Sequence, residues 1–129
     1  MKKDIEIPEV KNVTIAVVRE DGEWRVYLIN NNNVALENTL VSSTGYGEKD
    51  GQQQKTSTLR HFLETVPAKS WAVVEQINED VFHLSNEYWV SYYIDKQIFD
   101  KKFVFVPDSI KEENLSYIKE LEMEGVLHS

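Results

Sequence analysis

Apolar and polar residues alternate along most of the chain with a period of two, which is typical of strands that bury one face. The longest such stretch runs from Leu84 to Ile94, and another follows from Phe99 to Val106 after the pair Asp95-Lys96. We predict a β-hairpin there. Its buried face would consist of Tyr88, Val90, Tyr92 and Ile94, and its other face of Glu87, Trp89, Ser91, Tyr93 and Asp95.

A second hairpin is predicted nearer the N-terminus, where Asp21-Gly22 separates two alternating runs. Asp-Gly is a residue pair that two-residue hairpin turns favour. A two-residue loop at this point also brings the apolar faces of the two runs into phase. The register that follows pairs Glu20 with Glu23, Val17 with Val26 and Ile15 with Leu28.

Three further strands are predicted over residues 35–43, 56–62 and 71–77. Between the first two of them, residues 44–55 hold three glycines and no aliphatic residue. We therefore predict a long solvated loop, which is either an ordinary hairpin loop or a loop that contacts a ligand.

The spacing of Leu84, Tyr88 and Val90 matches a tyrosine corner. In that motif a tyrosine near the start of a strand turns its hydroxyl back onto the backbone a few residues upstream. The bond would hold the crossing from one sheet to the other over residues 78–83. The alternative interpretation is an aromatic-rich strand without this bond.

The C-terminal part of the chain predicts an α-helix over residues 108–125. Its signals are a capping box (Ser109, Glu112), an apolar stripe (Leu115, Ile118, Leu121) and a natural end (Gly125). The preceding strand, residues 103–106, is apolar on both faces, so we expect the helix to cover its second face. A second copy of the chain or another protein is the alternative partner of the stripe.

These elements predict a mainly β fold, a seven-stranded antiparallel sandwich of immunoglobulin or fibronectin type III kind with one C-terminal α-helix. A small open barrel is the alternative. The expected organisation is an N-terminal arm (1–9), the sandwich domain (10–107) and the helix packed on the same domain (108–125).

Composition narrows the choice of partners. Twenty-two acidic side chains against 14 lysines and arginines give the 129 residues a formal charge of −8, which repels nucleic-acid phosphates at long range. The lack of cysteine excludes disulfides and thiolate metal sites. No apolar run follows Lys2-Lys3, so we expect no signal peptide, no membrane anchor and a cytoplasmic location.

Candidate catalytic chemistry is sparse. The three histidines, His61, His83 and His128, are not spaced as metal ligands, and His61 is interpreted as a hydrogen-bonded histidine at the core margin. No nucleophile motif occurs, and a thiol nucleophile is excluded. We therefore predict no catalytic residue, no metal, no cofactor and no enzymatic activity.

Aromatic residues are the most suggestive candidates for binding. Trp89 and Tyr93 share the face opposite Tyr88, and Trp71 and Tyr46 are further candidates from other segments. If this face is exposed, it offers an aromatic platform for a peptide or a sugar. If the C-terminal helix covers it, these side chains belong to the core.

The whole chain resembles a family of short bacterial proteins of unknown function whose members are often labelled phenylalanyl-tRNA synthetase alpha subunit. The residues that carry the resemblance are Ile7-Pro8, Val10-Lys11, Tyr27-Leu28-Ile29-Asn30-Asn31, Leu36-Glu37, Leu40-Val41, Arg60-His61, Pro67-Ala68-Lys69-Ser70, Asn86-Glu87-Tyr88 and Asp100-Lys101-Lys102-Phe103-Val104-Phe105. The chain is too short, acidic and arginine-poor for a synthetase catalytic domain. The resemblance therefore implies a shared fold and no catalytic residues.

Two functions follow as hypotheses. The first is a non-enzymatic interaction module that holds an unidentified protein partner at a sheet edge or on the aromatic face, with a homodimer through the helix or an edge as a variant. The second is a small enzyme or an accessory protein of the translation machinery, associated with a synthetase.

Overall fold

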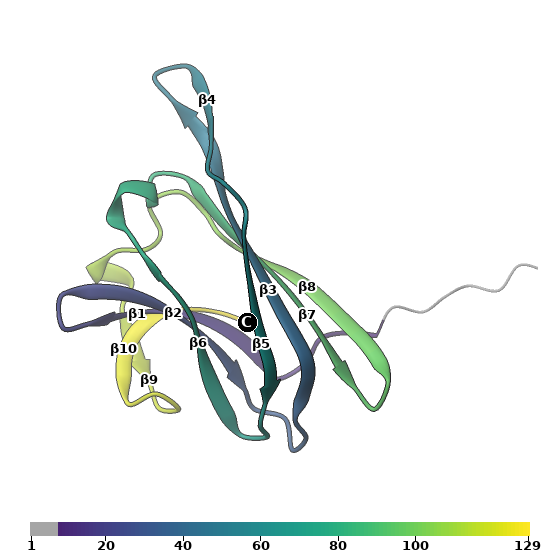
Figure 1. Ribbon diagram of the computed structural model, residues 1–129. Helices are drawn as coiled ribbons and strands as arrows, with labels where there is room; N and C mark the ends of the chain where they lie inside the picture. Colours follow the sequence, from purple (N-terminus) through teal and green to yellow (C-terminus); the bar gives the residue numbers. More distant parts are fainter. Residues whose placement is uncertain (1–7) are drawn as a thin grey trace, which may run out of the picture.

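The computed structural model describes residues 8–129, which form two antiparallel five-stranded sheets packed as a sandwich (Figure 1). The strands are β1 (Val13–Glu20), β2 (Glu23–Asn30), β3 (Leu36–Lys49), β4 (Gln52–Lys55), β5 (Leu59–Val66), β6 (Ser70–Ile77), β7 (Ser85–Ile94), β8 (Gln97–Phe105), β9 (Ser116–Ile118) and β10 (Met123–His128). The first sheet has the order β6-β2-β1-β10-β9. In the second, of order β4-β3-β7-β8, β5 also pairs with β3. The predicted β sandwich is confirmed at this level.

Both predicted hairpins are present, and the first has the predicted register. Val17 pairs with Val26 and Ile15 with Leu28, and the turn residues Asp21 and Gly22 have φ values of 52° and 80°. The β7–β8 hairpin turns at Asp95-Lys96 in the same left-handed region. Tight hairpin turns need positive φ at both central residues, because that geometry matches the strand twist.

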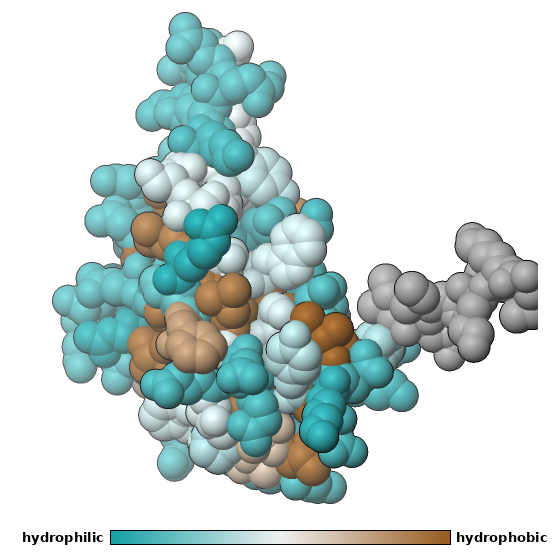
Figure 2. All heavy atoms as spheres, turned by 45° about the vertical axis from the view of Figure 1, so that its right-hand side comes forward, coloured by the Kyte–Doolittle hydropathy of each residue, from teal (hydrophilic) through white to brown (hydrophobic). Residues whose placement is uncertain are grey.

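The predicted loop over residues 44–55 is wrong. β3 continues to Lys49, reverses at Asp50-Gly51 and returns as β4, so the segment is a hairpin whose hydrophilic tip projects from the body (Figures 1 and 2). β4 and β5 pair with successive parts of β3, and residues 56–58 interrupt the strand between them.

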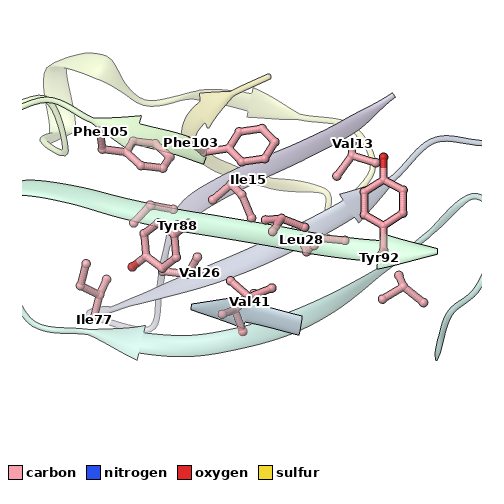
Figure 3. Close-up of a cluster of buried hydrophobic side chains, with 14 of the residues drawn as sticks. Val13, Ile15, Val26, Leu28, Val41, Ile77, Tyr88, Tyr92, Phe103 and Phe105 are labelled. Carbon is pink, nitrogen blue, oxygen red and sulfur yellow. The ribbon is translucent and has the colours of Figure 1, made fainter. Parts of the chain in front are cut away.

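The main core lies between the two sheets, where side chains of both inner faces interdigitate (Figure 3). Its largest fully buried side chains include Ile15, Val17, Val26 and Leu28 from the first sheet and Val41, Tyr88, Tyr92 and Phe103 from the second. The apolar residues of the alternating hairpin strands thus form the inner face of each sheet. This confirms the prediction for Tyr88, Val90 and Tyr92.

The predicted C-terminal α-helix is wrong, since no α-helix occurs in residues 8–129. Ser109 does not cap a helix: its hydroxyl donates to the Val106 carbonyl at 2.7 Å. Glu112 begins a single 3₁₀ turn, Glu112–Asn114, and its carboxylate lies 3.2 Å from Arg19 Nη1. The chain then forms β9 and β10, which supply two of the three strands beyond the seven predicted; β4 is the third.

Strand pairing replaces the helix because β1 needs a second neighbour. The four residues from Ile15 to Val18 are all buried, so both faces of β1 are covered, and one of its edges is filled by β2. β10 fills the other edge and satisfies backbone groups that burial would otherwise leave without partners. A short isolated helix is marginal in water and cannot compete with that pairing.

Gly125 is not a helix end but a point of close contact between β10 and β1. A Cβ atom at this position would lie 2.7 Å from Val18 Cγ1, 2.8 Å from Ile118 Cδ1 and 2.8 Å from the Val17 carbonyl oxygen. Ile118 and Leu121 from the predicted stripe are buried, against outward-facing residues of the first sheet that include Val18 and Tyr27.

The predicted tyrosine corner is also corrected. Tyr88 is fully buried, but its hydroxyl donates to the Glu75 carboxylate at 2.9 Å and not to upstream backbone. The crossing before β7 is held by Asn86, whose amide donates to the carbonyls of Val81 (3.0 Å) and the buried Leu84 (3.1 Å).

Most of the predicted N-terminal arm lies outside the described residues. Pro8 and Glu9, its last two positions, precede the first strand and belong to no element. Within residues 8–129, no helix has the length and apolar character needed to span a bilayer.

Replacing Gly125 by Ala is expected to lower the free energy of unfolding by about 1–3 kcal/mol, because the added methyl group overpacks the β1–β10 contact. Urea denaturation followed by circular dichroism measures this change. Gly51→Asn is the control, since a Cβ at Gly51 meets nothing within 4 Å and asparagine tolerates its φ of 77°. Equal stability of Gly125→Ala and the wild type would contradict the close contact.

Alkaline pH is expected to destabilise the fold through its buried tyrosines. Burial raises the pKa of Tyr92 to about 12, from a value of about 10 in the unfolded chain. The native state therefore disfavours tyrosinate, so this contribution is intact below about pH 10 and is lost as pH rises towards 12. Tyr92→Phe should flatten the decline of unfolding free energy between these values.

The control for this prediction is Tyr117→Phe, because the Tyr117 side chain is exposed. It should leave the alkaline decline as in the wild type. If Tyr92→Phe and Tyr117→Phe give the same pH dependence, burial of Tyr92 is not its source.

Candidate functional site

Two hollows lie on opposite faces of β3, separated by the interruption between β4 and β5. The outer groove, of about 460 Å³, lies on the exposed face of the second sheet and is lined by Tyr46, Trp89, Lys55, Arg60 and Glu87, among others. The inner cavity, of about 230 Å³, lies between the sheets and contains Glu75 and Tyr88.

The outer groove has aromatic walls that no element within residues 8–129 covers. Trp89 is 44 % exposed and Tyr46 38 % exposed, and Tyr93, four residues beyond Trp89 on the same face of β7, is 37 % exposed. Lys102 on the neighbouring strand β8 holds its ammonium 5.2 Å from the centre of the Trp89 ring. Of the two interpretations of this face, exposure fits the structure, because no helix of the described chain packs over it.

Trp71 does not join these residues. It lies on β6 at the edge of the first sheet, 46 % exposed, and its ring contacts Tyr27 edge-on at a centroid distance of 5.5 Å. The structure therefore brings Trp89, Tyr93 and Tyr46 to one face and leaves Trp71 on the other sheet.

Glu75 is the central group of the inner cavity and was not singled out by the sequence. Its side chain is only 12 % exposed. Its Oε1 accepts from the Ser43 hydroxyl at 2.9 Å and lies 2.7 Å from His61 Nε2, while its Oε2 accepts from the Tyr88 hydroxyl at 2.9 Å. One carboxylate on the first sheet thus joins β3, β5 and β7 of the second.

A β-bulge in β6 explains why Glu75 points inward. Glu75 pairs with Val26, and Val73 pairs with the next residue of β2, Tyr27, so Val74 is an extra residue in the ladder. Trp71 and Val73 face outward before the bulge, whereas Val74 is buried and Glu75 also faces the second sheet. Regular alternation would have placed Glu75 on the same side as Trp71 and Val73.

Burial and the neighbouring carboxylate also act on Tyr88. Desolvation first, and then the charge and the hydrogen-bond acceptor of Glu75, raise the pKa of Tyr88 well above its ordinary value. The phenol therefore stays protonated and remains a hydrogen-bond donor to Glu75. His61 is hydrogen-bonded at the core margin, as predicted.

This arrangement is not a nucleophile triad. In such a triad the imidazole lies between the hydroxyl and the acid and removes the hydroxyl proton. Here the carboxylate lies in the centre, and the Ser43 hydroxyl and His61 both contact its Oε1. The chemistry that the cavity offers is acceptance of hydrogen bonds by a carboxylate in a mostly apolar site.

No candidate metal site occurs in the described part of the chain, where no three histidine or acidic side chains converge. His83 bonds Gln54 at 2.7 Å, and the His128 ring packs edge-on against Phe103 and Phe105. The three imidazoles therefore serve separate local contacts.

Sequence reasoning missed Glu75, Ser43 and the two groove cations Lys55 and Arg60. One signal could have identified Glu75: its carboxylate follows a run of apolar residues in a predicted strand. Charged side chains are rarely buried unless they are paired, so a charge at such a position suggests a specific contact. Nothing comparable marks Lys55 and Arg60, since surface cations are common and their proximity depends on the β3–β4 hairpin.

Comparison with protein-family models, curated proteins and solved structures gives no match for this chain. The resemblance to the short bacterial proteins stays a prediction, and the function is argued below from geometry alone.

Glu75→Ala is expected to lower the free energy of unfolding by about 2–4 kcal/mol, because it leaves two hydroxyls and an imidazole without their acceptor inside the sandwich. Glu75→Gln should cost less, since its amide oxygen still accepts. Urea denaturation measures both, with the exposed Glu48→Ala as control. If Glu75→Ala unfolds like Glu48→Ala, the carboxylate does not hold the two sheets together.

Proposed function

We propose that the protein is a non-enzymatic interaction module and that the outer groove binds an extended segment of a protein partner. The observation that carries the proposal is the exposure of Trp89 and Tyr46 on either side of a groove that nothing in the described chain covers. Exposed aromatic residues that line a concave site are typical anchors of protein interfaces.

The apolar character of this face extends beyond the groove. Phe62 on β5 and Ile98 on β8 are 62 % and 42 % exposed and pair with Leu40 and Tyr93. Singly exposed apolar residues are ordinary, but a group that spans β5, β3, β7 and β8 is typical of an interaction surface.

Local charge favours an acidic partner segment. Lys55 and Arg60 line the groove with one acid, Glu87, and Lys102 lies over Trp89. Among residues 8–129 these three cations form no salt bridge, although the chain as a whole carries a charge of −8. A carboxylate beside an apolar side chain would find both a cation and an aromatic wall here.

The choice of a binding module over an enzyme rests on the inner cavity. Its two hydroxyls and its imidazole all contact the carboxylate, so the imidazole contacts the acid instead of activating a hydroxyl. Kinship with immunoglobulin-like binding domains is part of this proposal. The alternative role in the translation machinery has the resemblance as its sole support.

A test uses peptides selected from a random displayed library against the wild-type protein and then synthesised. Selected peptides should be rich in Asp and Glu, and their Kd should rise with salt, because surface ion pairs are screened. Trp89→Ala should weaken them by about thirtyfold, the effect of losing an interface anchor. Arg60→Glu should weaken them by repelling the peptide carboxylates. Titration calorimetry measures each Kd.

The matched control is Trp71→Ala, which removes a tryptophan of similar exposure from the other sheet. It should leave the peptide Kd unchanged. Peptides that bind Trp89→Ala as tightly as the wild type, or that show no preference for acidic residues, would count against the groove.

A further inference from the structure

The inner cavity has features of a ligand site that are separate from the outer groove. It lies between the sheets, on the opposite face of β3, and its single carboxylate is buried. We propose that it binds a small organic ammonium ion, a primary amine that carries a short apolar body.

Glu75 has an acceptor position left for a ligand. A carboxylate offers about four acceptor positions on its two oxygens. Among residues 8–129, Oε1 accepts from the Ser43 hydroxyl and contacts His61, whereas Oε2 accepts only from the Tyr88 hydroxyl. Both Glu75 and Tyr88 line the cavity, so a donor placed there can reach Oε2 or the Tyr88 oxygen.

The negative charge of Glu75 also favours a cationic ligand. Within residues 8–129 no lysine or arginine forms an ion pair with it, and His61 is its one basic neighbour. Burying a carboxylate is costly unless an opposite charge compensates it. An ammonium group supplies that charge, and the net charge of −8 attracts cations to the molecule at long range.

The remaining walls define the body of the ligand. Leu59, Ile77 and Val81 are apolar residues of the lining, and Thr56 and Ser57 are hydroxyl-bearing ones. A volume of about 230 Å³ is below the roughly 300–1,000 Å³ of sites for drug-sized molecules, so the body must be short. A small anion is disfavoured because it would face the carboxylate.

The binding experiment titrates the full chain with benzylammonium and n-butylammonium, with benzyl alcohol and butyrate as the neutral and anionic counterparts. Two-dimensional NMR follows the amide signals of the residues that line the cavity. Both amines should bind saturably, at least about tenfold more tightly than the alcohol, because a charge-assisted hydrogen bond is lost in the alcohol. Butyrate should not shift these signals.

Variants locate the site. Glu75→Gln keeps one acceptor oxygen, replaces the other with a donor NH2 and removes the charge, and it should weaken amine binding at least about tenfold. Leu59→Trp, at the exposed side of the cavity, should block binding by filling it while Glu75 stays in place. Trp89→Ala should leave amine binding unchanged, which separates this site from the outer groove.

Three results would overturn the proposal. They are the absence of saturable amine binding up to about 10 mM, equal affinity for amine and alcohol, and unchanged amine binding by folded Glu75→Gln. Circular dichroism of each variant confirms folding. None of these outcomes depends on whether the outer groove binds acidic peptides.

Discussion

The fold depends on one constraint: β1 is buried on both faces and must have a hydrogen-bonded strand at each edge. β2 satisfies one edge through a local hairpin, and β10 satisfies the other with residues from the far end of the chain. Since the pleat alternates, β1 then gives Ile15 and Val17 to the main core and Ala16 and Val18 to the smaller cluster with Ile118. The close approach of β10 requires glycine at position 125.

The second sheet supplies the surfaces on which the functional argument rests. Its inner face closes the core with Tyr88 and Tyr92, and its outer face exposes Trp89 and Tyr93 on the same strand. One alternating strand thus contributes to stability on one side and to a candidate interface on the other. The interruption at residues 56–58 lies where the outer groove and the inner cavity approach each other, and both hollows are lined in part by this segment.

Structural features that depend on residues close together in sequence were predicted correctly from the sequence pattern. Asp21-Gly22 and the period-two runs beside it specify a turn, a phase and therefore a register, and all three agree with the structure. Asp50-Gly51 is the same turn signal, but the glycines and glutamines around it lack apolar alternation, so the sequence predicts a loop where the structure has a hairpin. Alternation also predicts that Trp89 and Tyr93 share one face of their strand. It does not predict that this face is exposed, because the expected C-terminal helix could have covered it.

Features set by distant contacts could not be found in the same way. The capping box of Ser109 and Glu112 is a valid local signal, yet pairing with β1 outweighs it. The bulge at Val74 changes the phase within β6, so a strict period of two assigns Glu75 to the wrong side. The partner of the Tyr88 hydroxyl follows from that bulge, which no spacing within β7 reveals.

The pairing of β1 with β10 also has a consequence for biosynthesis. β1 and β2 are made well before β10, the strand that pairs with the other edge of β1 and the last element of the described chain. Until then β1 presents a bare, apolar edge, the kind of surface through which nascent chains aggregate. Completion of the first sheet therefore waits for a strand about a hundred residues further along the chain, and protection of the β1 edge during folding depends on how fast that distant pair forms.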